Sequence, residues 1–387
     1  MSEPSADSDL RDALRAHICT RLYEVEPGQF VRCQSRRSAV CPSCAGLYRG
    51  DWERIARSGI YDADGHPVSG YRYFFITLSA PSFGKVHRVP KPWDESRRRC
   101  HCGATHRPEE VELRGLPINL DDYDYEGQVR WHGALGRLWR SSVVAMRRRC
   151  PDAEYFAVRE VQARMALHVH AVVRVPGWAT VDVKTMGEAA RSATATHPVT
   201  RQQVRWGQKG SRDREIRANV SEAKDVNPDN SRAAARIVSY VGKALGYSLK
   251  DVTPGSSSAE NATPQRIAFL YRLRAAARHT VRCPDCPESG PGQCDRRAHD
   301  NLGYGGHVVT VSRSSNDREG WSLSHLTRKR LREERRAWME ANPPDDEGSG
   351  LSANAVKLSR WLRTWLERQG ARRARNEWEA RQYARAP

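Results

Sequence analysis

Three segments of the chain carry the hydrophobic pattern of β-strands. Residues 71–80, YRYFFITLSA, are aromatic and β-branched without a breaking residue, which predicts a central strand. The segments 154–162, EYFAVREVQ, and 166–175, ALHVHAVVRV, predict two more strands. Only the residues ARM separate these two segments, so we expect them to pair as a β-hairpin.

Helical patterns alternate with the strands. Residues 128–149 repeat apolar positions on one helical face and end in a basic turn, which suits a helix C-terminus. Residues 182–195 predict a short helix, 199–220 an irregular strand region, and 231–249 a helix that Ser231 can cap. The order strand, helix, hairpin, helix, strand, helix predicts an α+β fold with one antiparallel sheet and helices packed on it.

The net charge of the chain predicts a polyanionic partner. Lys and Arg number 64 against 46 Asp and Glu, which gives a formal charge of +18. Nucleic acid is the commonest partner for such a charge. No stretch is apolar enough for a membrane span, and MSEPSADSDL lacks the basic start and apolar body of a secretory signal. We therefore expect a cytoplasmic protein without a membrane partner.

Four cysteines cluster near the start of the chain, in a region with little sustained periodicity: Cys19, Cys33, Cys41 and Cys44. The last two form a Cys-x-x-Cys turn, in which two thiolates can grip one zinc ion. The cluster predicts a tetrahedral structural zinc site. Buried thiols that bind nothing are the alternative. Cys100 and Cys102, in RRRCHCG, are competing donors for the same metal.

A second group of metal-binding residues lies in the segment CPDCPESGPGQCDRRAH. Its members are Cys283, Cys286, Cys294 and His299. Their spacing predicts a small zinc knuckle, in which His307 could replace His299. Thiols without a metal are again the alternative.

Two histidines in the predicted hairpin indicate a different kind of metal site. His168 and His170 are two residues apart in a strand, so both side chains point to the same face. Glu160 comes eight residues before His168, which allows it to lie opposite the histidines across the hairpin. One carboxylate and two imidazoles can bind Mg²⁺ or Mn²⁺ with positions left open. The alternative is a solvated pair of surface histidines near a surface glutamate.

The predicted helix at 231–249 carries a second chemical group. Tyr240 and Lys243 are three residues apart and therefore neighbours on one helical face. A nearby ammonium favours the phenolate form of a tyrosine, and a phenolate is the form that attacks a phosphodiester. A half-buried aromatic residue with a snorkelling lysine would give the same pattern.

Taken together, these residues resemble a known family. FITLSAPSFG at 75–84, LHVHAVVR at 167–174 and RIVSYVGKALGY at 236–247 are similar to the three successive motifs of rolling-circle replication initiators, the HUH endonucleases. CPSCAGLYRGD, YDYEGQVRWHGALGRLWR, RWGQKG and LGYGGHVVTVSR also resemble stretches of initiators from actinobacterial plasmids and integrative elements. The resemblance covers about residues 19–315, and it depends on the order and spacing of the motifs.

The resemblance implies a ferredoxin-like antiparallel palm with zinc-binding insertions and a basic helical C-terminal region. By position, His168 and His170 match the metal-binding pair, and Glu160 matches an acidic third ligand, with Gln162 in reserve. Tyr240 matches the nucleophile, Lys243 the lysine of its motif, and Thr77 belongs to the first motif, among residues expected to contact DNA.

The chain also departs from the family pattern. Ser79 stands where a second threonine is often found, and Ala244 stands where an aromatic residue often follows Lys243. A second nucleophile one turn after Tyr240 is absent, which favours a mechanism with a single tyrosine. LPINLDDYDY lacks cysteines that relatives often carry, and Cys100 and Cys102 would then be remnants of a metal knuckle.

The implied activity is a metal-dependent DNA endonuclease and strand transferase that starts plasmid rolling-circle replication. It would nick origin DNA, as a single strand or hairpin, through a covalent 5′-phosphotyrosine. No Gly-x-x-x-x-Gly-Lys-Ser/Thr stretch is present, so we expect a host helicase to unwind and a host polymerase to extend the strand. Whether Tyr247 acts in the second transfer stays open.

The expected domains follow from these assignments. They are a Cys-rich region at 1–70, a nicking domain at 71–250 with an insertion at 81–127, a linker and second zinc module at 251–315, and a basic helical region at 316–387. Within the last region, Arg328, Arg330 and Arg332 are candidates for phosphate contacts. Solvated amphipathic helices would show the same pattern.

Two other classes of protein remain open. A transposase or conjugative relaxase would use the same chemistry, but relaxases usually place the nucleophile before the histidines, whereas Tyr240 follows them here. A non-catalytic, zinc-containing DNA-binding protein would keep the charge and the cysteines without a need for Tyr240.

Overall fold

The computed structural model describes residues 19, 21, 23–26, 29–36, 38, 40–62, 64–92, 98–209, 217–218, 222–226, 263–281, 301–315 and 318–341. The chain divides into two compact units, Met1–Thr327 and Arg328–Pro387. In the second unit the described residues form a basic helix, α8 (Arg328–Ala341). The sheet, the other helices and every cysteine of the described part belong to the first unit.

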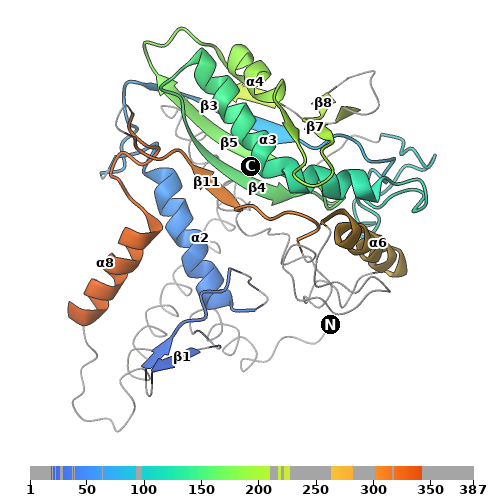
Figure 1. Ribbon diagram of the computed structural model, residues 1–387, viewed down its shortest axis with the longest axis horizontal. Coiled ribbons are helices and arrows are strands. Elements are labelled where there is room, and N and C mark those ends of the chain that lie inside the picture. Colours follow the sequence, from blue (N-terminus) through green and yellow to red (C-terminus); the bar gives the residue numbers. More distant parts are fainter. Residues whose placement is uncertain are drawn as a thin grey trace, which may run out of the picture. The chain divides into compact units, whose positions relative to one another are not determined.

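A five-stranded antiparallel sheet is the centre of the first unit (Figure 1). Its strands, in spatial order, are β10 (Glu222–Asp225), β3 (Tyr71–Ser79), β5 (Leu167–Pro176), β4 (Glu154–Val161) and β11 (Val309–Val311). Every neighbouring pair in this sheet is antiparallel. The α+β class and the antiparallel sheet that the sequence predicts are therefore confirmed.

Two helices connect these strands. Helix α3 (Tyr125–Arg149) lies between β3 and β4 in the chain, and α4 (Val183–Arg191) lies between β5 and β10. The connectivity is strand, helix, strand, strand, helix, strand, with the first and third of these four strands in the centre. This is the topology of a split β–α–β unit.

Helix α3 begins and ends as its sequence predicts. Asp124 caps the helix by accepting a hydrogen bond of 2.7 Å from the Gly127 backbone N–H. Three arginines form the last turn, Arg147 to Arg149, where positive charge stabilises the helix dipole. Trp131, Leu135 and Leu138 are buried in the core against β3 and β5. The periodic face at 128–149 is thus the face that packs on the sheet.

Shorter strands extend the first unit beyond α4. They are β6 (Thr194–Thr196), which pairs with β7 (Gln203–Arg205), and β8 (Gln208–Lys209), which pairs with β9 (Arg217–Ala218). Trp131 donates from Nε1 to the backbone oxygen of Arg205 at 2.9 Å, and Trp206 donates to Ser142 at 2.8 Å. The hydrogen bonds of these two indoles connect the segment after α4 to helix α3.

The other face of the sheet is partly covered by helix α2 (Pro42–Arg57) and the segment around Trp321. Arg174, fully buried on β5, pairs with Glu154 on β4. The guanidinium of Arg174 also donates to the backbone oxygens of Gly59 at 3.0 Å and Gly320 at 2.7 Å. One buried side chain thus joins the sheet, the end of α2 and a segment far along the chain.

Helix α6 (Pro264–Val281) lies within the stretch that the sequence presents as a linker and zinc module. Its residues Phe269, Leu273 and Ala277 are buried in the same core as α3. Arg266 donates to three backbone oxygens, those of Glu112, Arg114 and Ala163. It therefore joins α6 to the insertion and to the turn between β4 and β5.

Candidate active site and metal centres

The two hairpin histidines and their partners come from three neighbouring strands. In the β4–β5 pair Glu160 lies opposite His168, so the hairpin has the predicted register. In the β3–β5 pair Thr77 lies opposite His170, and Ser79 lies opposite His168. The odd-numbered residues of β5 face the core, so the histidines are on the face away from α3.

Hydrogen bonds fix the orientation of both imidazoles. The Nδ1 of His170 lies 3.0 Å from the Thr77 hydroxyl, and the Nδ1 of His168 lies 3.0 Å from the Ser79 hydroxyl. The Nε2 of His170 lies 2.9 Å from Oε2 of Glu160. Each histidine thus turns its second nitrogen away from the hydroxyl, and for His170 that nitrogen faces the carboxylate.

The environment keeps His168 neutral. Burial and the neighbouring His170 lower the pKa of His168 to about 3. The His170 side chain is 5% exposed and stacks on the ring of Phe75, with ring planes 10° apart. A neutral imidazole is the form that binds a metal, so burial favours the ligand form of His168.

The geometry of Glu160 and His170 suits a metal as well as a direct hydrogen bond. Two octahedral ligands at right angles, each about 2.1 Å from Mg²⁺, lie about 3.0 Å apart. The observed 2.9 Å between Oε2 and Nε2 matches that separation. The side-chain nitrogen of Gln162 lies 3.5 Å from Nδ1 of His168. This is the same nitrogen that the Ser79 hydroxyl contacts.

Several predicted site residues lie outside the described residues. They are Tyr240, Lys243 and Tyr247 of the predicted helix, and Cys283, Cys286, Cys294 and His299 of the predicted second zinc site. Thr77, expected among the DNA contacts, is buried, and its hydroxyl lies against His170. Ser79 is a site residue that the sequence signals only as a departure from a family motif.

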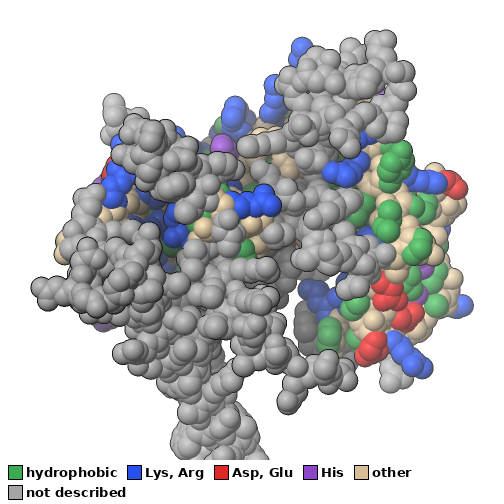
Figure 2. Space-filling model, turned by 90° about the horizontal axis from the view of Figure 1, so that it is seen from below, with side chains coloured by type: hydrophobic (Ala, Val, Ile, Leu, Met, Phe, Trp, Pro, Cys, Tyr) green, Lys and Arg blue, Asp and Glu red, His purple; other side chains and the backbone are tan. Residues whose placement is uncertain are grey.

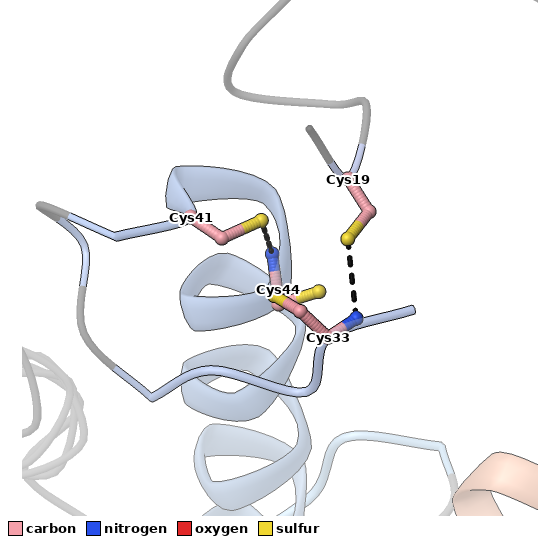
Figure 3. A group of neighbouring side chains, drawn as sticks. All are labelled: Cys19, Cys33, Cys41 and Cys44. Atoms are coloured by element: carbon pink, nitrogen blue, oxygen red, sulfur yellow. Dashed lines mark hydrogen bonds between the residues drawn. The ribbon is translucent and has the colours of Figure 1, made fainter. Parts of the chain in front are cut away.

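The four N-terminal cysteines meet at the start of α2 (Figure 3). Cys41 is the N-cap of the helix and Cys44 lies in its first turn, while Cys19 and Cys33 flank the hairpin of β1 (Tyr23–Glu26) and β2 (Gln29–Val31). The four sulfur atoms all lie within 4.8 Å of one another, and they can hold a metal ion. A Cys₄ set of this kind fits structural zinc, as the sequence predicts.

Backbone groups and charge both favour a cation among these sulfurs. Cys33 donates its backbone N–H to the sulfur of Cys19 at 3.2 Å, and Cys44 donates to that of Cys41 at 3.5 Å. Burial and the neighbouring sulfurs raise the pKa of Cys33 to about 12. Burial opposes ionisation of Cys19 as well, but backbone hydrogen bonds lower its pKa to about 7. A cation among the sulfurs would offset the burial that opposes ionisation of Cys33 and Cys19.

Cys100 and Cys102 do not join this N-terminal cluster. They lie instead with His87 and His106, in a second group whose ligand atoms are all within 4.8 Å of one another. The sequence gives the two cysteines as donors that compete for the first metal, and that interpretation is wrong. The partners of these cysteines, His87 and His106, are loop residues without a periodic signal.

Basic side chains are spread over the described surface. Figure 2 shows Lys and Arg at several separate places on one face, with acidic side chains nearer its right edge. On α8, the side chains of Lys329 and Arg330 are 82% and 58% exposed, and each pairs with a glutamate one turn later. Arg328, Arg330 and Arg332 thus lie on a helix with mixed charge. In the described part of the chain, no helix has the length and apolar composition of a membrane span.

Comparison with known proteins gives two matches in sequence. A family described as RepSA, replication initiator protein of pSAM2, matches residues 20–385. A replication initiator protein of Streptomyces ambofaciens is 31% identical over 339 residues, which cover 75% of this chain and 68% of that protein. No solved structure matches the fold.

Proposed function

The chain belongs to the RepSA family of replication initiators, and we propose that it starts rolling-circle replication by nicking and rejoining one strand of its origin. The proposed catalytic domain is an HUH endonuclease palm formed by β3, α3, β4, β5, α4 and β10. The proposed substrate is origin DNA as a single strand or an extruded hairpin, because a site mounted on a sheet does not reach a phosphate inside regular duplex.

The observation that carries this proposal is the arrangement of Glu160, His168 and His170 on adjacent central strands. The two imidazoles lie 5.1 Å apart between ring centroids, and Glu160 lies across the hairpin from His168 and 2.9 Å from His170. His170 is buried and lies 2.9 Å from the Glu160 carboxylate, and a convergence of ionisable groups of this kind is typical of functional sites. A divalent-metal site at the centre of a palm accounts for this convergence.

Glu160, His168 and His170 would hold Mg²⁺ or Mn²⁺. When bound there, the ion would offset the charge that builds up on the scissile phosphate in the transition state. The chain's own contribution is orientation. The hydroxyls of Thr77 and Ser79 hold Nδ1 of each imidazole, and such supporting contacts fix ligand direction and basicity.

Tyr240 is the proposed nucleophile. Its phenolate oxygen forms a bond to phosphorus, the bond from phosphorus to the 3′ oxygen breaks, and that oxygen takes up a proton to become a free 3′-hydroxyl. The products are a 5′-phosphotyrosine and a primer end for a host polymerase. Attack by a 3′-hydroxyl on the same phosphorus reverses the reaction, so rejoining needs no nucleotide hydrolysis. Lys243, three residues along in the predicted helix, would favour the phenolate.

A covalent adduct tests the proposal. The full chain is incubated with single-stranded origin DNA and Mn²⁺, and the products are separated under denaturing conditions. We expect a protein–DNA adduct with the wild type and with Tyr247→Phe, and none with Tyr240→Phe. His170→Ala should also lose the adduct, because it removes a proposed metal ligand and the imidazole that Glu160 contacts.

The control variant separates the roles of the two tyrosines. Tyr247 lies two helical turns from Tyr240 in the predicted helix, so both substitutions remove one phenol oxygen from the same segment. An adduct that persists in Tyr240→Phe, or a wild type that binds origin DNA without any adduct, would show that the chain initiates replication by another route.

A further inference from the structure

We propose that His87, Cys100, Cys102 and His106 form a second structural site for a zinc-class metal ion, inside the insertion between β3 and α3. These four residues lie in the segment 81–127, apart from the Cys₄ cluster at the start of α2. The proposal is independent of nicking activity, since it depends only on the ligand atoms and their surroundings.

The distances between the ligand atoms fit a tetrahedral zinc ion. With bonds of about 2.0–2.1 Å to nitrogen and about 2.3 Å to sulfur, two nitrogens lie about 3.3 Å apart, and a nitrogen and a sulfur about 3.5 Å apart. The observed separations are 3.1 Å from Nδ1 of His87 to Nε2 of His106, and 3.3 Å from that Nε2 to the sulfur of Cys102. The sulfur of Cys100 lies 3.9 Å from Nδ1 of His87.

The two cysteines lie in a tight turn that aims their sulfurs the same way. In CHCGATH the backbone N–H of Gly103 donates to the oxygen of Cys100 at 3.0 Å, and the N–H of Cys100 donates to the oxygen of Ala104 at 2.7 Å. Gly103 has φ +94°, a left-handed conformation that suits glycine. Arg88 also donates its backbone N–H to the sulfur of Cys100, at 3.3 Å. Such bonds stabilise a thiolate.

His106 has the support that metal-binding histidines usually have. Its Nε2 faces the other three ligands, while its Nδ1 lies 3.2 Å from Oε1 of Glu110. The second oxygen of Glu110 accepts the backbone N–H of Arg107 at 2.6 Å, which fixes the carboxylate. A carboxylate on the far nitrogen selects the tautomer whose Nε2 lone pair is available to a metal.

The donor set defines the class of metal. Two thiolates and two imidazoles suit Zn²⁺ and exclude Mg²⁺ or Ca²⁺, which prefer oxygen ligands. Four protein ligands leave no open position, so the site is structural. Its ligands hold the chain at His87, where the backbone also bonds to Leu116 and Gly115. A metal here would therefore fasten the insertion close to the backbone that Arg266 contacts.

Metal content gives the first test. The full chain is dialysed against a weak chelator, and zinc per chain is measured for the wild type, Cys102→Ser and His106→Gln. We expect each variant to lose about one zinc ion per chain and to retain the ion of the Cys₄ cluster. His101→Gln is the matched control, because His101 lies between the two cysteines but outside the ligand group, and it should lose none.

A second test uses the wild type alone and does not depend on variant folding. Cys102 is exposed, whereas Cys150 is buried. With zinc bound, the thiol of Cys102 should react severalfold more slowly with N-ethylmaleimide than after a strong chelator is added, while Cys150 stays protected in both cases. Full zinc content in both variants, or equal labelling of Cys102 with and without chelator, would overturn the proposal.

Discussion

His132 shows how a single buried residue makes stability depend on pH. It is fully buried on α3, its Nδ1 lies 2.9 Å from the backbone oxygen of Leu302, and its Nε2 accepts the backbone N–H of Leu167 at 3.3 Å. Both contacts require the neutral imidazole with its proton on Nδ1. Burial accordingly lowers the pKa of His132 to about 4.

The sign of the pH effect follows from this lowered pKa. In the unfolded chain a histidine titrates near 6.5. Below that pH the unfolded state therefore binds a proton that the folded state does not bind. We expect the free energy of unfolding to fall by about 1.4 kcal/mol per pH unit for this one group as pH drops from about 6.5 to about 4.

Denaturant titrations at several pH values measure this effect. The non-titrating variant His132→Gln should be less stable at neutral pH but should fall less steeply than the wild type over that interval. Other histidines with lowered pKa act on both proteins alike, so the difference in slope reports His132. Equal slopes of unfolding free energy against pH in the two proteins would mean that His132 does not cause the loss of stability at acidic pH.

The hydroxyl of Thr77 makes a second prediction at the scale of one residue, and it depends on the proposed nicking activity. Thr77→Val removes the partner of Nδ1 of His170 while keeping the side-chain shape. We expect about a 10- to 100-fold slower formation of the covalent adduct, as is usual when a support of a metal ligand is lost. The Mn²⁺ concentration for half-maximal rate should rise as well.

Thr77→Ser keeps the hydroxyl and serves as the matched control for this prediction. It should restore both the rate and the Mn²⁺ requirement. If Thr77→Val slowed the reaction with an unchanged Mn²⁺ requirement, Thr77 would have a packing role and not a role in holding His170.

At the scale of elements, two glycines at helix α2 give opposite expectations. A Cβ added to Gly59, just beyond the helix, would lie 2.3 Å from the indole ring of Trp321 and 2.6 Å from its backbone oxygen. A Cβ added to Gly50, inside the helix, would meet nothing within 4 Å. The first position is therefore crowded by another segment of the chain, and the second is not.

Thermal or denaturant unfolding of the two alanine variants tests this difference. We expect Gly59→Ala to destabilise the protein by about 1–3 kcal/mol through overpacking. Gly50→Ala should stabilise it by about 0.5–1 kcal/mol, because alanine loses less backbone freedom in a helix. Similar stabilities of the two variants would show that α2 does not pack against Trp321 in solution.

The elements that the sequence predicts are those with local and regular patterns. Strands β3, β4 and β5 are largely apolar runs that are buried over most of their length, and helix α3 buries one regular face. Helix α6 also buries one face, which carries Phe269 and Leu273, but it exposes the apolar Ile267 and Tyr271 on the other side, so its sequence lacks a clear contrast between an apolar and a polar face. Helix α2 follows directly on the Cys₄ cluster, where no periodicity is sustained, and β11 has only three residues.

The candidate site likewise has one part that sequence patterns predict and another part that they do not. Glu160, His168 and His170 belong to one hairpin, so alternation along two adjacent strands is enough to bring them together. Thr77 and Ser79 reach the histidines through the pairing of β3 with β5, which joins segments about ninety residues apart. The His87 and His106 group depends on a loop conformation, which residue spacing alone does not specify.

At the scale of the whole molecule, the charge of +18 predicts how origin binding responds to salt. Each phosphate neutralised on a single strand contributes about −0.7 to the slope of log K against log salt. If α8 contacts the DNA phosphates, Arg332→Gln should weaken binding to origin DNA and to unrelated single strands alike. The slope should become shallower by about the contribution of one phosphate.

Fluorescence anisotropy with labelled oligonucleotides across a salt series measures that slope. Arg332→Lys keeps the positive charge and should leave the slope unchanged. A wild-type slope in Arg332→Gln would remove α8 from the DNA-binding surface and leave the cations of the first unit as candidates.

The contacts of Arg266 affect how this protein can diverge. Among the described residues, its guanidinium binds carbonyl groups of the main chain, at positions 112, 114 and 163. Mutations that replace the side chains at 112 and 163 therefore leave this junction intact, whereas a change at 266 itself removes all three links at once. Homologous chains can thus vary freely at the two loop positions as long as the arginine is inherited.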